Sequence, residues 1–162
     1  LKVLRSSTSQ LIANDAMQLS LLISDNSLED STQTALKKYA RADLLAYQNK
    51  NKEAIASLED ILQNHKGEKI EDEALLKQAE LLIEEKKFES AEFNYQKIVE
   101  FYSDGILADD AHFALGELYE NILNEPEKAK SHYEKIIYNY QDSYYFPQAR
   151  KNFRRLRGDA VN

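Results

Sequence analysis

The chain has 162 residues and a formal net charge of −7, and its 43% hydrophobic and 30% charged residues are typical of a globular protein. No apolar run reaches the roughly 20 residues of a membrane-spanning helix, so we predict no membrane span. The sequence contains no cysteine, which excludes disulfides, thiolate metal sites and thiol catalysis.

Charge is distributed unevenly along the sequence. Residues 144–162 hold five basic residues and one acid, whereas residues 1–143 hold 16 basic and 27 acidic residues. An acidic body repels the phosphates of nucleic acids, and five basic residues on one short helix are too few to reverse that repulsion. We therefore predict that the protein has no nucleic-acid partner.

The first predicted element is a single helix at residues 9–24, where the apolar residues Met17, Leu19, Leu22 and Ile23 follow a helical period. Residues 1–31 have no room for a second helix, so we interpret them as an N-terminal helix and loop left from a partial repeat. The chain opens without a Met or a signal peptide, and we expect it to be a piece of a longer protein.

A helix-turn-helix unit then recurs three times, at residues 32–68, 69–106 and 107–143. The first stretches of the units start 39 and 37 residues apart, at Ala35, Ala74 and Ala111. The second stretches start at Lys52, Phe88 and Pro126. Apolar residues in these stretches recur at three- and four-residue steps, and strand alternation is not sustained anywhere. The sequence therefore predicts an all-α fold.

Gly116 lies inside a predicted helix, where glycine costs about 1 kcal/mol relative to alanine. We interpret it as a position where another helix passes too close for a side chain. Ala42 and Ala79 occupy the equivalent positions of the other two units.

Residues 144–162 are predicted as a capping helix and tail. Phe146, Ala149, Phe153 and Leu156 share one face and basic residues cover the rest, which is the pattern that the end of a repeat array needs. Arg157-Gly158-Asp159 could be an adhesion tripeptide. Arginine in a last turn followed by glycine is also a common helix ending, and we predict the helix ending.

The repeated positions resemble those of the tetratricopeptide repeats. In the third unit the resemblance is carried by Leu115-Gly116-Glu117-Leu118-Tyr119, then by Ala129, Tyr133 and Ile136. The units are longer than the 34 residues usual in the family, and Lys66, Ser103 and Gln141 replace its end-of-unit proline. The resemblance implies a right-handed α-solenoid of about three repeats, flanked by the N-terminal helix and the capping helix.

The resemblance also implies a concave groove lined by the first helix of each unit. The groove positions are Tyr39, Asp43 and Tyr47 in the first unit, Glu73, Leu76, Glu80 and Glu84 in the second, and Asp110, Phe113, Glu117 and Glu120 in the third. Co-chaperone members of the family hold a partner's carboxylate with Lys, Arg and Asn at these positions. These residues contradict such a carboxylate clamp and predict an acidic groove with aromatic and apolar inserts.

We interpret the chain as a protein–protein interaction scaffold that binds a basic or amphipathic segment of a protein or peptide in this groove. Two alternatives stay open. The groove acids could serve only to keep the surface solvated. The array could instead be a structural module of a larger bacterial envelope protein that binds no peptide, and that forms a homo-oligomer through residues 1–24 or docks onto missing domains.

Catalytic and cofactor motifs are absent from the sequence, and four scattered glycines cannot build a phosphate-binding loop. His65, His112 and His132 fall in different predicted helices. Asp109 and His112 have a spacing that could offer two metal ligands, but Asp109 is better explained as a first-turn acid favoured by the helix dipole. We therefore predict no enzymatic activity, no cofactor and no metal site.

The long repeat period and the Tyr-x-Asp-Ser ending at residues 140–143 are similar to bacterial cell-envelope members of the family, including outer-membrane assembly lipoproteins. This similarity predicts a periplasmic or envelope-associated location. A cysteine-free sequence fits the cytoplasm equally well.

Overall fold

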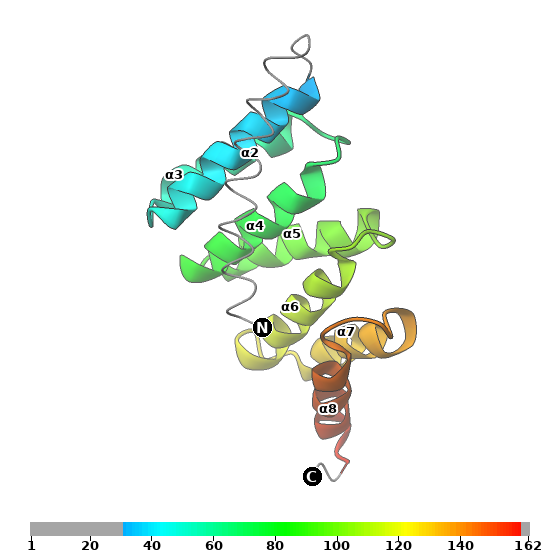
Figure 1. The fold of residues 1–162 in the computed structure, drawn as a ribbon. Coiled ribbons are helices and arrows are strands. Elements are labelled where there is room, and N and C mark those ends of the chain that lie inside the picture. The colour runs from blue at the N-terminus through cyan, green and yellow to red at the C-terminus, as the bar shows by residue number, and fades with distance from the viewer. Residues whose placement is uncertain (1–30, 160–162) are drawn as a thin grey trace. The chain divides into compact units, whose positions relative to one another are not determined.

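The computed structural model describes residues 31–159, and within that range the chain forms helices and no strand (Figure 1). The helices are α2 (Ser31–Tyr47), α3 (Asn51–Asn64), α4 (Glu71–Glu84), α5 (Phe88–Phe101), α6 (Ala108–Asn121), α7 (Pro126–Asn139) and α8 (Phe146–Arg157). The predicted all-α, helical-repeat class is confirmed. The helix predicted at residues 9–24 lies outside the described residues.

The first helices of the repeats begin earlier than the sequence alignment placed them. Helix α4 begins at Glu71, three residues before Ala74, and α6 begins at Ala108, three residues before Ala111. The first turn of each helix carries two or more acidic residues, and negative charge at a helix N-terminus is favoured by the helix dipole. The second helices α5 and α7 begin where the sequence predicts.

Each turn that joins the two helices of a repeat contains one residue in the left-handed conformation. These residues are Asn49, Lys86 and Asn124, with φ values of 61°, 60° and 55°. Their spacings of 37 and 38 residues match the repeat period, so the three turns are equivalent. Asparagine adopts this conformation more readily than lysine does, and Lys86 therefore carries a local backbone strain.

Helices α2, α3 and α4 belong to one compact unit, and α5 to α8 belong to a second. In the first unit α3 packs against both α2 and α4. The buried core of this unit consists of Tyr39, Ala42, Ala54, Leu58, Ile61, Ala74 and Leu81. Leu58 and Ile61 have no exposed surface, and burial of each contributes about 1.5–3 kcal/mol. The alanines let the helices approach closely.

In the second unit α6 packs against α5 and α7, and α7 packs against α8. A Cβ atom built on Gly116 would lie only 2.8 Å from both Cδ1 and Cζ of Tyr133 on α7. Tyr133 is itself fully buried, and its hydroxyl donates to Glu120 of α6 at 3.1 Å. The close helix contact predicted at Gly116 is therefore confirmed, and the group that passes close to it is the Tyr133 ring.

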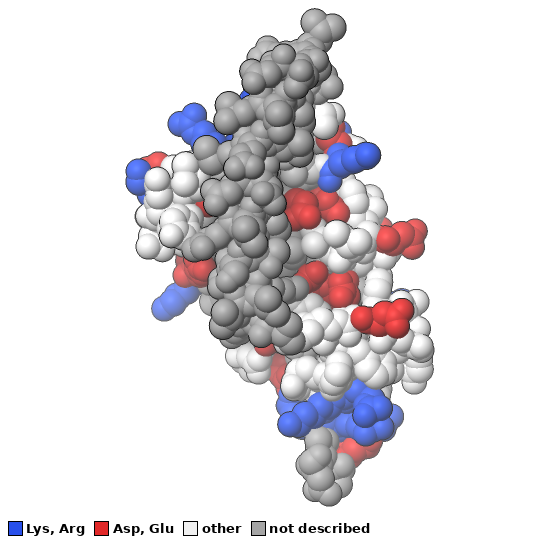
Figure 2. Space-filling view, in the orientation of Figure 1, with Lys and Arg blue, Asp and Glu red and all other residues white. Residues whose placement is uncertain are grey.

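The predicted capping pattern of α8 is also confirmed. Ala149 is fully buried and Phe153 and Leu156 are half-buried, while all the basic residues of the helix are exposed. Figure 2 shows these Lys and Arg side chains gathered around α8. The helix is therefore amphipathic, with an apolar side on α7 and a basic side towards solvent.

Helix α8 ends at Arg157, and Gly158 follows in the left-handed conformation with φ 94°. The Gly158 N–H donates to the Arg155 carbonyl at 3.1 Å, and the Asp159 N–H donates to the Arg154 carbonyl at 2.9 Å. These two bonds define a Schellman motif. The Arg157 guanidinium pairs with the Asp159 carboxylate. The Arg-Gly-Asp tripeptide is thus a helix ending, as predicted from the sequence.

Candidate functional site

The predicted groove residues are distributed over both compact units. Helix α2 carries Tyr39, Asp43 and Tyr47, helix α4 carries Glu73, Leu76, Glu80 and Glu84, and helix α6 carries Asp110, Phe113, Glu117 and Glu120. The first two helices belong to one unit and the third belongs to the other. The environment of these residues differs between the two units.

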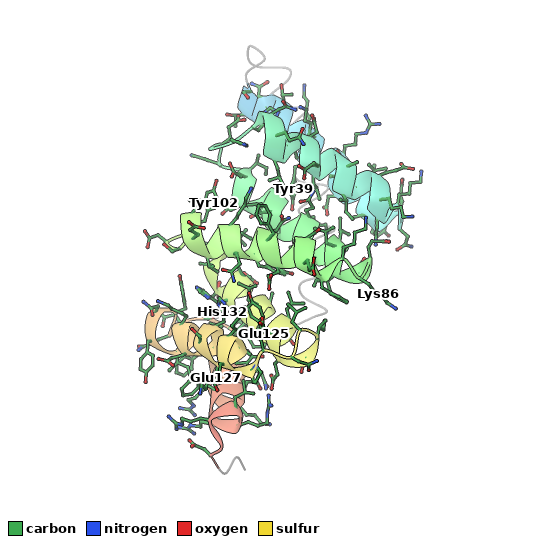
Figure 3. All side chains as sticks on the ribbon, turned by 180° about the vertical axis from the view of Figure 1, so that it is seen from behind. Tyr39, Lys86, Tyr102, Glu125, Glu127 and His132 are labelled. Carbon is green, nitrogen blue, oxygen red and sulfur yellow. The ribbon has the colours of Figure 1, made fainter. Side chains whose placement is uncertain are left out.

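In the first unit, the side chain of Tyr39, labelled in Figure 3, is buried, and acidic residues of α2 and α4 lie near it. Burial, and then the negative charges of Glu73 and Asp43, raise the pKa of the Tyr39 phenol above its usual range. Asp43 is also buried and pairs with Lys77 of α4, with 3.1 Å between Oδ1 and Nζ. Tyr39 and Asp43 therefore contribute to the packing of α2 against its neighbours, and the structure gives them a structural role.

Two acids at the start of α4 lie in surroundings that disfavour their ionised forms. Burial raises the pKa of the Glu73 carboxyl, and the charges of Asp72 and Glu80 raise it further. Burial likewise raises the pKa of the Asp72 carboxyl, and the charge of Glu71 adds to the effect. A raised carboxyl pKa means that the ionised form is less stable here than in water. This part of α4 therefore concentrates negative charge.

The remaining groove positions of the first unit are more accessible. Tyr47 is 66% exposed, Glu80 and Glu84 are exposed, and Leu76 is half-buried. Glu84 accepts a hydrogen bond at 2.8 Å from the side-chain amide of Asn51. Tyr47, Leu76 and Glu80 thus combine an aromatic ring, an apolar side chain and a carboxylate within reach of solvent.

In the second unit, other side chains of the same unit contact three of the four groove residues. The Tyr145 hydroxyl donates to Asp110 at 2.9 Å, and its ring stacks on Phe113 with 4.5 Å between the ring centroids. Glu120 accepts a hydrogen bond from the Tyr133 hydroxyl at 3.1 Å and pairs with Arg155 of α8.

Of the four α6 groove positions, Glu117 is the one whose side chain is exposed. The other three stabilise the junction of α6 with α7 and α8. Sequence reasoning explained the basic residues of α8 by the helix dipole, and it did not foresee that Arg155 pairs with a groove acid.

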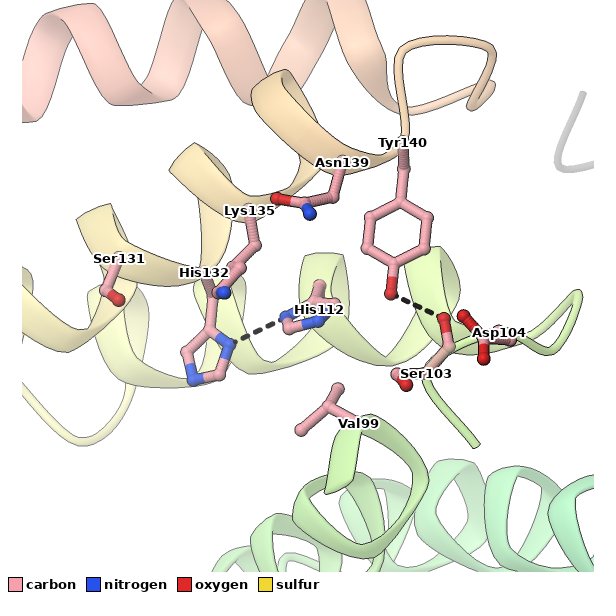
Figure 4. Close-up of a pocket in the computed structure, with 9 residues that line it drawn as sticks. All are labelled: Val99, Ser103, Asp104, His112, Ser131, His132, Lys135, Asn139 and Tyr140. Atoms are coloured by element: carbon pink, nitrogen blue, oxygen red, sulfur yellow. Dashed lines mark hydrogen bonds between the residues drawn. The ribbon is translucent and has the colours of Figure 1, made fainter. Parts of the chain in front are cut away.

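A pocket of about 510 Å³ lies in the second unit, at a place that sequence reasoning did not identify (Figure 4). His112 of α6 and His132 of α7 line it, with a hydrogen bond of 3.0 Å between their Nδ1 atoms. Figure 4 shows Lys135 and Asn139 on the same wall as His132. The Tyr140 hydroxyl closes one side by donating to the Ser103 carbonyl at 2.7 Å.

Both histidines of the pocket are neutral at pH 7. Burial lowers the pKa of His112 to about 4, with smaller effects from His132 and Lys135. Burial and then Lys135 lower the pKa of His132 to about 4. Aromatic rings hold the pair in place, since His132 stacks on Tyr119 and His112 lies against Tyr140. No signal in the sequence indicated that the two histidines meet, because they are 20 residues apart on different helices.

Asp109 precedes His112 by three residues, a spacing that could offer two metal ligands. In the structure the Ser143 hydroxyl donates to the Asp109 carboxylate at 2.6 Å. Asp109 lies in the first turn of α6, as expected. Between residues 31 and 159, no group of three or more His, Cys, Asp or Glu side chains is arranged around a metal position. No helix in that range is long and apolar enough to cross a membrane.

Comparison with known protein families identifies two of the three predicted repeats. The family model described as tetratricopeptide repeat matches residues 73–105 and 110–143, which cover the pairs α4–α5 and α6–α7 except for the first two residues of α4 and of α6. The matches support the resemblance of the second and third predicted repeats to this family. No curated protein and no solved structure matches the chain. Tetratricopeptide repeats generally mediate protein–protein interactions and are typically non-catalytic scaffolds.

Proposed function

We propose that this domain binds a basic or amphipathic segment of a protein partner, and that the first unit makes the main contact. The contact surface is the acidic face of α2 and α4, where Asp72, Glu73 and Glu80 make the contact, while Asp43 is buried, pairs with Lys77 and serves the packing beside them. Opposite charge would steer a basic segment to this face. The neighbouring Tyr47 and Leu76 would bury apolar side chains of the segment.

The observation that carries the proposal is the clustering of carboxylates around one buried phenol. The four acids of the acidic face all raise the pKa of Tyr39, so all four lie close to one point. Burial raises the pKa of the Asp72 and Glu73 carboxyls, so their ionised forms are less stable here than in water. A cationic group of the partner would stabilise these ionised forms. On α6, by contrast, Glu120 is already matched by Arg155.

The test is fluorescence anisotropy with two matched synthetic peptides, one of alternating Lys and Leu and one of alternating Glu and Leu. We expect the Lys peptide to bind, with an affinity that falls as salt is added, and the Glu peptide not to bind. Glu80→Lys should weaken binding about tenfold, or about 1.4 kcal/mol. Glu117→Lys should have a smaller effect, because it lies in the second unit.

A matched control is needed because charge reversal alters the whole field of the protein. Glu53→Lys combined with Glu134→Lys changes the net charge by the same amount as Glu80→Lys combined with Glu117→Lys. Both control residues are exposed and lie on the second helices α3 and α7. Equal losses of affinity in the two double variants would reject the acidic face as the binding surface.

A second candidate function is self-association, favoured by the charge of α8. This helix carries five basic residues and no acid, and it is opposite in charge to the acidic face of α2 and α4. Light scattering across a concentration series would show a mass above that of one chain at low salt and the mass of one chain at high salt. A salt-independent monomer would exclude this function. Association through residues 1–24 and an envelope location both stay predictions.

A further inference from the structure

We propose that His112 and His132 form a binding site for a late first-row transition-metal dication, Cu²⁺ or Ni²⁺. This inference is independent of the proposed peptide-binding function, since the two histidines lie in the second unit and belong to no groove position. It departs from the sequence-based prediction of no metal site, which considered only Asp109 as a second ligand beside His112.

The distance between the two rings suits such an ion. The Nδ1 atoms are 3.0 Å apart. Two nitrogens bonded to one metal at about 2.0–2.1 Å are about 2.9 Å apart at a right angle and about 3.3 Å apart at the tetrahedral angle. The observed separation is close to the right-angle value, which is the geometry of tetragonal Cu²⁺ and Ni²⁺ sites with nitrogen and oxygen ligands.

The protonation of the pair is compatible with ligation. In the hydrogen bond one ring donates its Nδ1–H, and the other ring accepts through the Nδ1 lone pair. For both rings to bind metal, the donor ring transfers its proton from Nδ1 to Nε2 through solvent, which leaves two neutral rings and releases no net proton. Ligation by both rings then requires each ring to turn about its Cβ–Cγ bond until the two Nδ1 lone pairs converge on the metal ion.

The surroundings of the pair can complete the coordination. Both rings line the pocket of about 510 Å³, which is large compared with the roughly 30 Å³ that one water occupies. Water can therefore fill the remaining metal positions. The lining also contains the oxygen-bearing side chains of Asp104, Ser131 and Asn139.

Lys135 opposes a cation at this position, and that opposition gives the proposal a specific test. Its ammonium group lines the same pocket and lowers the pKa of both histidines, so it would also repel a bound metal ion. With only two protein ligands and this repulsion, we expect a micromolar dissociation constant. Removal of the Lys135 charge should tighten metal binding, which a site elsewhere on the protein would not show.

The experiment is calorimetric titration of the full 162-residue chain with copper chloride and with nickel chloride at neutral pH. We expect one ion per chain, bound more tightly as Cu²⁺ than as Ni²⁺. His132→Phe keeps a ring against Tyr119 and should weaken binding about tenfold or more. Lys135→Gln should tighten it about threefold or more. His65→Gln is the control and should leave the affinity unchanged.

Electron paramagnetic resonance of the Cu²⁺ complex should show coupling to two imidazole nitrogens, and to none in a His112→Phe, His132→Phe double variant. Equal affinity of wild type and His132→Phe would overturn the proposal, as would a spectrum without histidine nitrogen. If circular dichroism shows that the His132→Phe variant does not fold, the affinity of the Lys135→Gln variant tests the site instead. An affinity unchanged by Lys135→Gln would then reject the site.

Discussion

Glu73 of α4 and Glu120 of α6 are both predicted groove acids, yet their charges are balanced differently. Burial and neighbouring carboxylates raise the pKa of Glu73, whereas Glu120 accepts the Tyr133 hydroxyl and pairs with Arg155. An ionised Glu73 therefore costs stability in the free protein. Perturbed carboxyl pKa values are frequent at functional sites, and this is why we propose the partner surface on the first unit.

This cost predicts a pH dependence with a definite sign. Because the folded-state pKa of Glu73 is raised, the folded protein binds more protons than the unfolded chain between the ordinary pKa and the raised value. Stability therefore falls as pH rises through that window. We expect Glu73→Gln to stabilise the domain at pH 7 by roughly 0.5 kcal/mol, and the gain to disappear once the solution is acidic enough to protonate Glu73.

Urea unfolding of both proteins across a pH series would measure this gain. Glu134→Gln, on the exposed face of α7, is the control for removing one negative charge. A gain of Glu73→Gln that is the same at acidic and neutral pH would contradict the explanation by burial.

Lys86, the left-handed residue in the turn between α4 and α5, is another single residue in an unfavourable conformation. Its counterparts in the other repeats are Asn49 and Asn124, and asparagine tolerates positive φ better than lysine. We expect Lys86→Asn to stabilise the domain by about 0.5–1 kcal/mol, measured by urea unfolding. The reverse change, Asn124→Lys, should destabilise it by a similar amount. If both changes were neutral, the three turns would not share one conformation in solution.

At the scale of the elements, the packing of α6 on α7 depends on one glycine. A side chain at Gly116 would overlap the ring of Tyr133, which has no exposed surface. The helical propensity that alanine would add, about 1 kcal/mol, is therefore outweighed by the overlap. We expect Gly116→Ala to destabilise the domain by about 1–3 kcal/mol in urea unfolding, and Gly116→Leu to destabilise it at least as much.

A double-mutant cycle identifies the ring as the cause. In a Tyr133→Leu background the overlap is relieved, so Gly116→Ala should become neutral or stabilising. The same cost of Gly116→Ala in both backgrounds would show that the glycine has another role, such as a backbone conformation, and would contradict the close contact.

Helix α8 connects the element scale to the whole molecule because it covers the open side of the second unit. It packs against α7, and Arg155 on it pairs with Glu120 of α6. Removal of residues 144–162 also removes the Tyr145 ring that covers Phe113. We expect this truncation to destabilise the protein by about 3 kcal/mol or more and to lower its solubility.

Thermal unfolding of the truncated chain would measure the loss. Removal of residues 160–162 alone is the matched control and should leave the melting temperature unchanged, because the Schellman ending at Gly158 stays in place. A truncation at residue 143 with wild-type stability would show that α8 is not a cap.

For the molecule as a whole, the sequence determined the helical class, the second and third repeats, the close contact at Gly116 and the basic cap. These features follow from local periodicity and from single residues such as Gly158, whose conformational preferences act within a few positions of the chain. The position of each groove residue on a first helix could also be predicted, because a helical face is fixed by spacing along the sequence.

The tertiary structure alone decided which of those residues are accessible and which are bonded. The burial of Tyr39, the use of Asp110 and Glu120 by Tyr145 and Arg155, and the meeting of His112 with His132 all join residues distant in sequence. Such contacts depend on how helices pack, and a periodic sequence is compatible with many side-chain pairings across a helix interface. The physical reason is that periodicity fixes the face of a helix, while packing fixes the partner of each side chain.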